Sequence, residues 1–360
     1  MGWSDESGFR RNNFDFLRFA LACLVIFSHS FILLSGSERT EPVYRLTGGQ
    51  INAGAVAVNG FFVISGFLVA GSWFNSSGVV DFLRKRILRI YPGFIVATAI
   101  AALVVVPLAS GAGMSSISAF NPIRWILRAL RLKEYVQTPV FTQNPYPKAV
   151  NGSLWSIPYE FYCYLMIAGL GVTGLLRNRR VVGILLALSI VGSVIFVLVQ
   201  GRMQAYFPGR TFNPVRLLPY YLAGTAFYVF REKIPWSNRL ACIAAVALIP
   251  AAFPQWGMTL ALPVAGSYLL FWVAYHPRIR LERWARFGDF SYGIYLYAFP
   301  IQQLLILWRG PMHPLALFWV AGILAIVAGA ISWHTVEKHC LRIKRRRKAG
   351  HEAGKLARLT

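Results

Sequence analysis

Long apolar runs recur along almost the whole chain, and they decide what it can fold into. A transmembrane helix needs about 20 consecutive apolar residues. Ten segments approach or reach that length: roughly 14–34, 53–74, 87–108, 153–172, 181–199, 215–230, 239–254, 258–275, 290–308 and 315–335. Only 14% of the 360 residues are charged, where a soluble domain carries about 25%. The pattern excludes a soluble enzyme, a disordered chain and a disulfide scaffold, and predicts an all-α, polytopic membrane helix bundle.

The basic residues predict how this bundle is oriented. The net charge of +24 would suggest nucleic acid as the partner of a soluble chain. Here the bases lie between apolar runs, so the excess of Lys and Arg in cytoplasmic loops explains them better. With the N-terminus inside, 25 bases fall on inner segments and 11 on outer ones, while Arg18 lies within the first span. We therefore expect two cytoplasmic termini and no nucleic acid, with a tail at 1–13, a membrane domain at 14–335 and a basic tail at 336–360.

One loop, residues 109–152, is long, and we place it outside. Asn121-Pro122 and Asn144-Pro145 break regular structure within it. Between these breaks, residues 123–133 put Arg124, Arg128 and Arg131 on one helical face, which predicts an interfacial helix rather than an eleventh span. The four cysteines lie in apolar runs or in the basic tail, so neither a disulfide framework nor a metal site is indicated.

Ionisable groups inside a membrane are expensive and mark functional sites. Of the thirteen acids, only Glu160 lies well inside an apolar stretch, and among the histidines His29 lies farthest into a span. At about 1.5 Å per residue, His29 is roughly 8 Å and Glu160 roughly 10 Å below the outer surface. A carboxylate beside an imidazole orients a general base. The sequence therefore predicts a His29–Glu160 pair, and a plain polar contact between helices is the alternative.

A second polar group lies toward the cytoplasmic side. Asp15 and Arg18 share one face of the first helix, and Arg18 is about 16 Å from His29 along it. Arg86 and Arg89 belong to a dense basic cluster at the start of the third span. These arginines are either topological anchors or a phosphate site. Acids at span ends, such as Asp289 and Glu337, are expected to reach water.

Small residues in the second span predict close helix packing. Gly60 and Gly66, with Ser65 beside them, allow another helix to approach, and Gly224 in the sixth span is a similar position.

Five motifs follow one another along the chain: FDFLRFA at 14–20 with VIFSHS at 25–30, FFVISGFL at 61–68, RILRIYP at 86–92, LWSIPYE at 154–160 and SYGIYLY at 291–297. Together and in this order they resemble the acyltransferase 3 family of integral membrane acyltransferases. The resemblance extends over most of the chain. It departs after Tyr297, where some members have a histidine and this chain has Ala298 and Phe299. An acid is common where Asn59 stands, and no C-terminal hydrolase-like domain is expected.

The resemblance implies an O-acyltransferase, usually an O-acetyltransferase, that modifies a sugar of a cell-surface or exported glycan from the bacterial inner membrane. It implies acetyl-CoA as the donor substrate, with no tightly bound cofactor. His29 and Glu160 would be catalytic, and Arg18, Arg86, Arg89 and Asp15 would belong to the donor site. Trp155, Ser65 and Gly66 would contact substrate or pack the site. The bilayer, the acyl-CoA and the glycan are the expected partners, and the oligomeric state stays open. The rival reading is a transporter or flippase of a lipid-linked sugar.

Overall fold

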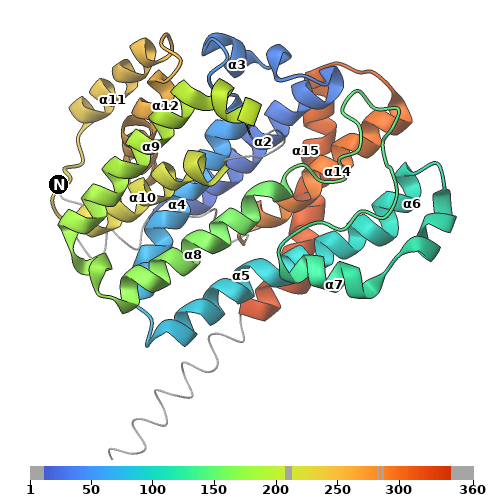
Figure 1. Ribbon diagram of the computed structural model, residues 1–360, viewed down its shortest axis with the longest axis horizontal. Coiled ribbons are helices and arrows are strands. Elements are labelled where there is room, and N and C mark those ends of the chain that lie inside the picture. The colour runs from blue at the N-terminus through green and yellow to red at the C-terminus, as the bar shows by residue number, and fades with distance from the viewer. Residues whose placement is uncertain (1–11, 207–212, 280, 282–283, 285–287, 342–360) are drawn as a thin grey trace, which may run out of the picture.

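The computed structural model describes residues 12–206, 213–279, 281, 284 and 288–341, and these residues contain helices but no strand (Figure 1). The all-α prediction is confirmed. The long helices are α2 (Phe14–Ser35), α4 (Ala53–Phe74), α5 (Val79–Ile100), α8 (Ile157–Val172), α9 (Arg179–Tyr206), α10 (Asn213–Phe230), α11 (Asn238–Ala251), α14 (Ser291–Arg309) and α15 (Pro314–Ser332). Shorter helices are α3 (Pro42–Leu46), α6 (Val106–Ala109), α7 (Pro122–Leu130), α12 (Gly257–Ala261) and α13 (Ser267–Ala274).

Each predicted apolar segment coincides with helix, and six helical segments are long and apolar enough to cross a bilayer. These six are Phe14–Ser35, Ala53–Phe74, Val79–Ala109, Arg179–Gln200, Gly257–Ala274 and Pro314–Leu341. α8, α10, α11 and α14 are shorter or less apolar. The number of crossings and the sides of the termini therefore stay predictions.

Some boundaries differ from those expected, and two of the differences bear on function. α5 begins at Val79 rather than near 87, so the basic cluster at 84–89 lies further along the helix and not at its start. α8 begins at Ile157 rather than 153, because residues 154–156 form a short 3₁₀ turn. Glu160 is therefore in the first turn of α8 and not in its middle.

Local sequence explains where several helices start. The side chain of Asn52 accepts a hydrogen bond from the backbone N–H of Ala55 at 2.7 Å and caps α4. Asn121 caps α7 in the same way, with Pro122 in the first turn where its missing N–H costs nothing. The predicted helix in the long loop is confirmed as α7, although it ends at Leu130.

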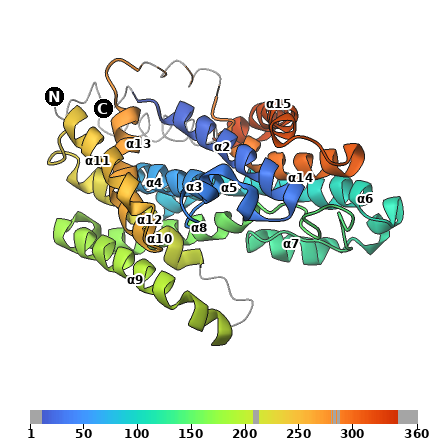
Figure 2. The same cartoon turned by 90° about the horizontal axis from the view of Figure 1, so that it is seen from above.

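α4 occupies the centre of the bundle, with α2, α14 and α15 on one side and α9 and α10 on the other (Figure 2). Two glycines allow α4 and α10 to touch. A Cβ atom at Gly66 would overlap the carbonyl of Tyr221, and one at Gly224 would overlap the carbonyl of Val63. The close packing predicted from these glycines is confirmed. It fixes the position of Ser65, the neighbour of Gly66.

Candidate active site

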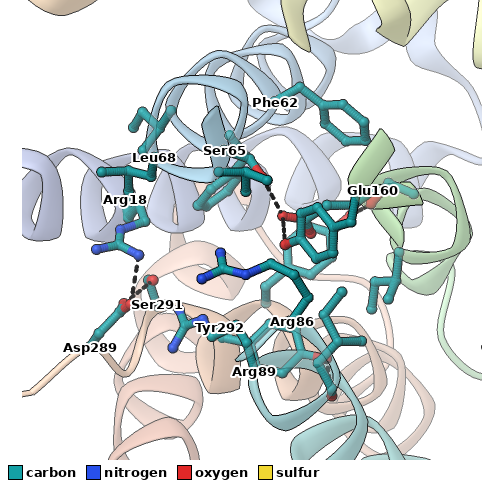
Figure 3. A pocket seen from close by; sticks show the side chains of 18 of the residues that line it. Arg18, Phe62, Ser65, Leu68, Arg86, Arg89, Glu160, Asp289, Ser291 and Tyr292 are labelled. Carbon is teal, nitrogen blue, oxygen red and sulfur yellow. Dashed lines mark hydrogen bonds and ion pairs between the residues drawn. The ribbon is translucent and has the colours of Figure 1, made fainter. Parts of the chain in front are cut away.

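A cavity of about 370 Å³ lies between α2, α4, α5, α8 and α14, and most of the predicted polar residues line it (Figure 3). Its lining includes six of the nine predicted site residues, namely Asp15, Arg18, Ser65, Arg86, Arg89 and Glu160. The volume falls within the range of about 300 to 1,000 Å³ that is typical of ligand sites. Three predicted residues, His29, Trp155 and Gly66, are not among the lining residues.

One end of the cavity is organised by Asp289. This carboxylate lies 2.8 Å from Nη1 of Arg18 and 2.5 Å from Nη2 of Arg89, and it accepts a hydrogen bond from the hydroxyl of Ser291 at 2.5 Å. Arg18 also forms the expected ion pair with Asp15. Two arginines from α2 and α5 are therefore held side by side by one acid from the start of α14.

Arg86 is the cation that is left for a ligand. Its Nη2 donates to the hydroxyl of Ser72 at 3.2 Å, and its guanidinium lies over the rings of Phe82 and Tyr164 at 5.9 and 5.7 Å. Among the described residues no carboxylate lies within ion-pair distance of Arg86, unlike Arg18 and Arg89. Arg86 projects into the middle of the cavity (Figure 3).

Two buried guanidinium nitrogens reinforce this picture. Nε of Arg18 and Nε of Arg86 are buried and have no hydrogen-bond acceptor in the described part of the chain. Buried donors are rarely left without a partner, and each exception calls for an explanation. A bound anion with several acceptor oxygens would supply the missing acceptors.

The carboxylate of Glu160 lies at the other end of the cavity. Its Oε1 accepts hydrogen bonds from the hydroxyl of Ser65 at 2.8 Å and from that of Tyr164 at 2.6 Å. Ser65 comes from α4, and Tyr164 lies one turn farther along α8 than Glu160. The carboxylate is thus positioned by two hydroxyl groups that no part of the sequence reasoning had assigned to it.

The predicted pairing of Glu160 with His29 is wrong in this structure. No hydrogen bond joins the two residues, and the ring of His29 instead packs edge-to-face on Phe299, with 5.2 Å between ring centroids. Helical rise gave a similar depth for both side chains, but depth does not determine which way a helix faces. Nδ1 of His29 is buried without a hydrogen-bond partner among the described residues.

α2 and α14 connect His29 to the cavity. Arg18 and His29 are eleven residues apart, which brings both to nearly the same face of α2 at about 100° per residue. Arg18 pairs with Asp289, which lies just before α14, and His29 packs on Phe299, which lies farther along α14. The two helices therefore run parallel, and His29 lies about 16 Å beyond Arg18 along their shared seam.

The tyrosines of α14 and the role of Asp289 were missed by the residue-level reasoning. The hydroxyl of Tyr295 lies 2.8 Å from the hydroxyl of Ser156 and donates to the carbonyl of Ser153 at 2.6 Å. Tyr292 donates to the carbonyl of Ile90 at 2.9 Å. Both line the cavity. The motif SYGIYLY was the signal for these tyrosines. Asp289 was expected to reach water, and the structure places it between two arginines instead.

Trp155 lies outside the cavity, on the opposite face of the start of α8. It lines a separate groove between α7 and α8, of about 820 Å³. Among the described residues, no group of three or more His, Cys, Asp or Glu side chains is placed to hold a metal ion.

Comparison with known proteins identifies the family. Residues 11–334 match the acyltransferase domain that defines the acyltransferase 3 family. The chain is 30% identical to an O-acetyl transferase of Shigella phage Sf6 over 92% of its own length and 96% of that protein's. It is also 30% identical to nodulation protein 10 of Rhizobium leguminosarum bv. viciae, over 96% of the chain and 97% of the relative. No solved structure matches the chain significantly.

The chain therefore belongs to the acyltransferase 3 family and is a multi-pass membrane protein. The resemblance predicted from its motifs is confirmed.

Proposed function

We propose that this protein is a membrane O-acetyltransferase that transfers an acetyl group from cytoplasmic acetyl-CoA to a sugar hydroxyl of a cell-surface or exported polysaccharide. The observation that carries the proposal is the cavity, which joins an arginine-rich end to a carboxylate held by two hydroxyl groups. The relative named O-acetyl transferase supports the choice of acetyl as the group transferred. We place the enzyme in the bacterial inner membrane.

The arginine-rich end suits the phosphates of the donor. Arg86 has no acid partner in the described chain, and two buried Nε atoms lack acceptors. Arginine is well matched to phosphate because its planar fork donates two hydrogen bonds at once. Arg18 and Arg89 would add attraction while Asp289 keeps them in place. The thioester arm would then extend along the seam of α2 and α14 toward His29.

His29 would act as the base. It would take the proton of the acceptor hydroxyl as the oxygen forms a bond to the acetyl carbon, and the bond to the CoA sulfur would break to release the thiolate. A transient acetyl group on His29 is the alternative route. Glu160 is not placed to orient His29, so its proposed role is to hold a polar group of a substrate within the cavity.

Purified full-length protein in liposomes tests the proposal directly. The liposome membrane contains an extract of lipid-linked glycans, and acetyl-CoA labelled in its acetyl group is added on one side of the membrane. Label should then appear on the glycan. A flippase of lipid-linked sugar would move glycan between the leaflets and leave it unlabelled. If no glycan is labelled and glycan moves between the leaflets, the protein is a transporter and the proposed activity is wrong.

A further inference from the structure

We propose that the groove between α7 and α8 binds a glycan acceptor through the phosphate that links it to a lipid carrier. This inference rests on the proposed function, because it names the class of acceptor that the same enzyme would use. The groove, which Trp155 lines, is separate from the cavity that holds Arg86 and Glu160.

The charge in the groove selects an anion. Arg124, Arg128, Arg131 and Lys133 line it, and none of these four cations makes an ion pair with a described acid. The acid that also lines the groove, Glu134, does little to offset them near neutral pH. Its burial raises its pKa to about 8, against the weaker lowering effects of a hydrogen bond from the Asn151 backbone and of Arg128. A phosphate is the anion that such a cluster of arginines binds best.

The same helix that carries the arginines also exposes an apolar face. Ile123, Ile126, Leu127 and Leu130 of α7 are all exposed, from 48% to 69% of their surface. α7 lies beside α5, where the hydroxyl of Tyr91 donates to the carbonyl of Leu130 at 2.9 Å (Figure 1). An exposed apolar face next to arginines that have no acid partner among the described residues suits an amphiphile, with hydrocarbon along the helix and a charged head in the groove.

Aromatic side chains of α8 and of the 3₁₀ turn before it form the opposite wall. Trp155, Tyr159 and Tyr162 lie in a row, with 6.2 Å between the ring centroids of each successive pair. Trp155 and Tyr162 are 37% and 57% exposed. Flat aromatic faces offer apolar contact, and tyrosine adds a hydroxyl at its edge. Such a row suits the sugar that follows the phosphate.

A short chain of contacts leads from the groove to His29. Asn151 lines the groove, and its side chain donates to the carbonyl of Leu296 at 2.6 Å. The next residue, Gly152, lies so close to the ring of Phe299 that a Cβ atom there would come within 2.5 Å of it. Phe299 is the residue against which His29 packs. Only the backbone at Gly152 and the ring of Phe299 therefore lie between a sugar in the groove and His29, the proposed base.

Binding of farnesyl diphosphate, a short lipid diphosphate without sugar, tests the phosphate site without any transfer reaction. Labelled farnesyl diphosphate should bind the detergent-purified full-length protein, and unlabelled inorganic diphosphate or farnesol should compete poorly. The double variant Arg124→Gln/Arg131→Gln removes two exposed charges and should weaken binding about tenfold or more, since hydrogen bonds to charged groups are the strong ones. Arg39→Gln/Arg45→Gln, two exposed arginines of another loop, is the matched control and should bind as the unmodified protein does.

Three results would overturn the inference. The first is equal weakening by the control variant, which would indicate attraction by overall charge. The second is unchanged affinity in Arg124→Gln/Arg131→Gln. The third is equally effective competition by phosphatidylglycerol, which would make the groove a seat for ordinary membrane lipid. Acetyl-CoA binding should be the same in all these proteins. If the unmodified protein binds the lipid diphosphate but labels no glycan, the proposed activity is wrong and the phosphate site stands.

Discussion

Asp289 and His29 lie at the two ends of the proposed reaction path, one beside the arginines and the other as the proposed base. Asp289 pairs with two arginines at once, and Arg86 is the cation of the cavity that has no acid partner among the described residues. His29 lies on the same seam about 16 Å away, with a buried nitrogen that has no partner among the described residues. Neither arrangement is needed for packing alone, because neutral side chains could fill the same space at lower cost in a membrane.

Replacing Arg86 should weaken the donor site selectively. Arg86→Ala should lower the affinity for acetyl-CoA about tenfold or more, and Arg86→Lys should recover only part of it, because lysine cannot donate through a planar fork. Equilibrium binding of labelled acetyl-CoA to purified protein measures this. Arg177→Ala changes a base outside the cavity, in a loop that is also predicted to be cytoplasmic, and serves as the control. Equal affinity in all three proteins would leave Arg86 as a topological anchor.

His29 and Glu160 should act independently. His29→Ala and His29→Gln should each reduce transfer about 10² to 10⁴ fold, as expected for loss of a general base. Glu160→Gln should also reduce it. Since the two side chains do not touch, their losses should multiply in the double variant. Initial rates of labelled acetyl transfer measure all four proteins. A double variant no worse than the single ones would restore the direct pairing that the structure does not contain.

Glu134 should make thermal stability depend on pH. Its pKa is raised by burial to about 8 in the folded protein and lies near 4.3 in an unfolded chain. Between these values the folded state holds a proton that the unfolded state has lost, so stability falls as pH rises from about 4.5 to about 8 and changes little above that. Melting temperatures of the unmodified protein and Glu134→Gln, measured across this range, should differ in slope, with the flatter curve for the variant. Parallel curves would show that this carboxyl is not buried as described.

At the scale of helices, apolar periodicity and length predicted the elements well, because burial in lipid leaves few alternatives to helix. Glycines in α4 and α10 each predicted close approach by another helix, and the structure shows that these two helices approach each other. What could not be predicted was rotation about each helix axis. Glu160 turns toward Ser65, whereas Trp155 and Tyr159 of the same motif turn toward the groove beside α7. Contacts between distant segments decide such rotations.

The contact between α4 and α10 should be intolerant of a single methyl group. Gly224→Ala places a Cβ atom on the carbonyl of Val63, and backbone atoms cannot move aside as a flexible side chain would. We expect a clear loss of folded protein, seen as a lower yield of monodisperse protein and a lower melting temperature. Gly192→Ala, on α9 with open space around it, should behave as the unmodified protein does. Unchanged stability of Gly224→Ala would mean that these helices are farther apart in the membrane.

At the scale of the whole molecule, two contacts between loops that are far apart in the sequence agree with the predicted topology. The side chain of Gln50 donates to the carbonyl of Ala252 at 2.6 Å, and Arg179 pairs with Glu232 at 2.9 Å. Two residues in contact outside the membrane lie on the same side of it, so the chain between them crosses the membrane an even number of times. The ten-span prediction places six crossings between the first pair and two between the second, so both pairs satisfy it.

Cysteine labelling can test which side each connection faces. In a background without the four native cysteines, Ser115→Cys should react with a membrane-impermeant maleimide in intact cells. Ser77→Cys, also exposed but on the opposite predicted side, should react only after the membrane is opened. The opposite pattern would invert the orientation, and it would place the arginine-rich end of the cavity away from cytoplasmic acetyl-CoA.

The side chain of Asn13 has a consequence for the order in which the protein is made. Its amide donates to the carbonyls of Val273 and Ile279 at 3.0 and 2.9 Å and accepts from the backbone N–H of Leu281 at 2.9 Å. Arg18, one turn farther along, finds Asp289 in the same late segment. The ribosome releases these partners only after most of the chain has been synthesised. α2 can pack against α4 as soon as both helices are made, but its polar end acquires these partners only when the segment before α14 follows. A chain interrupted before Asp289 would therefore lack part of the proposed donor site.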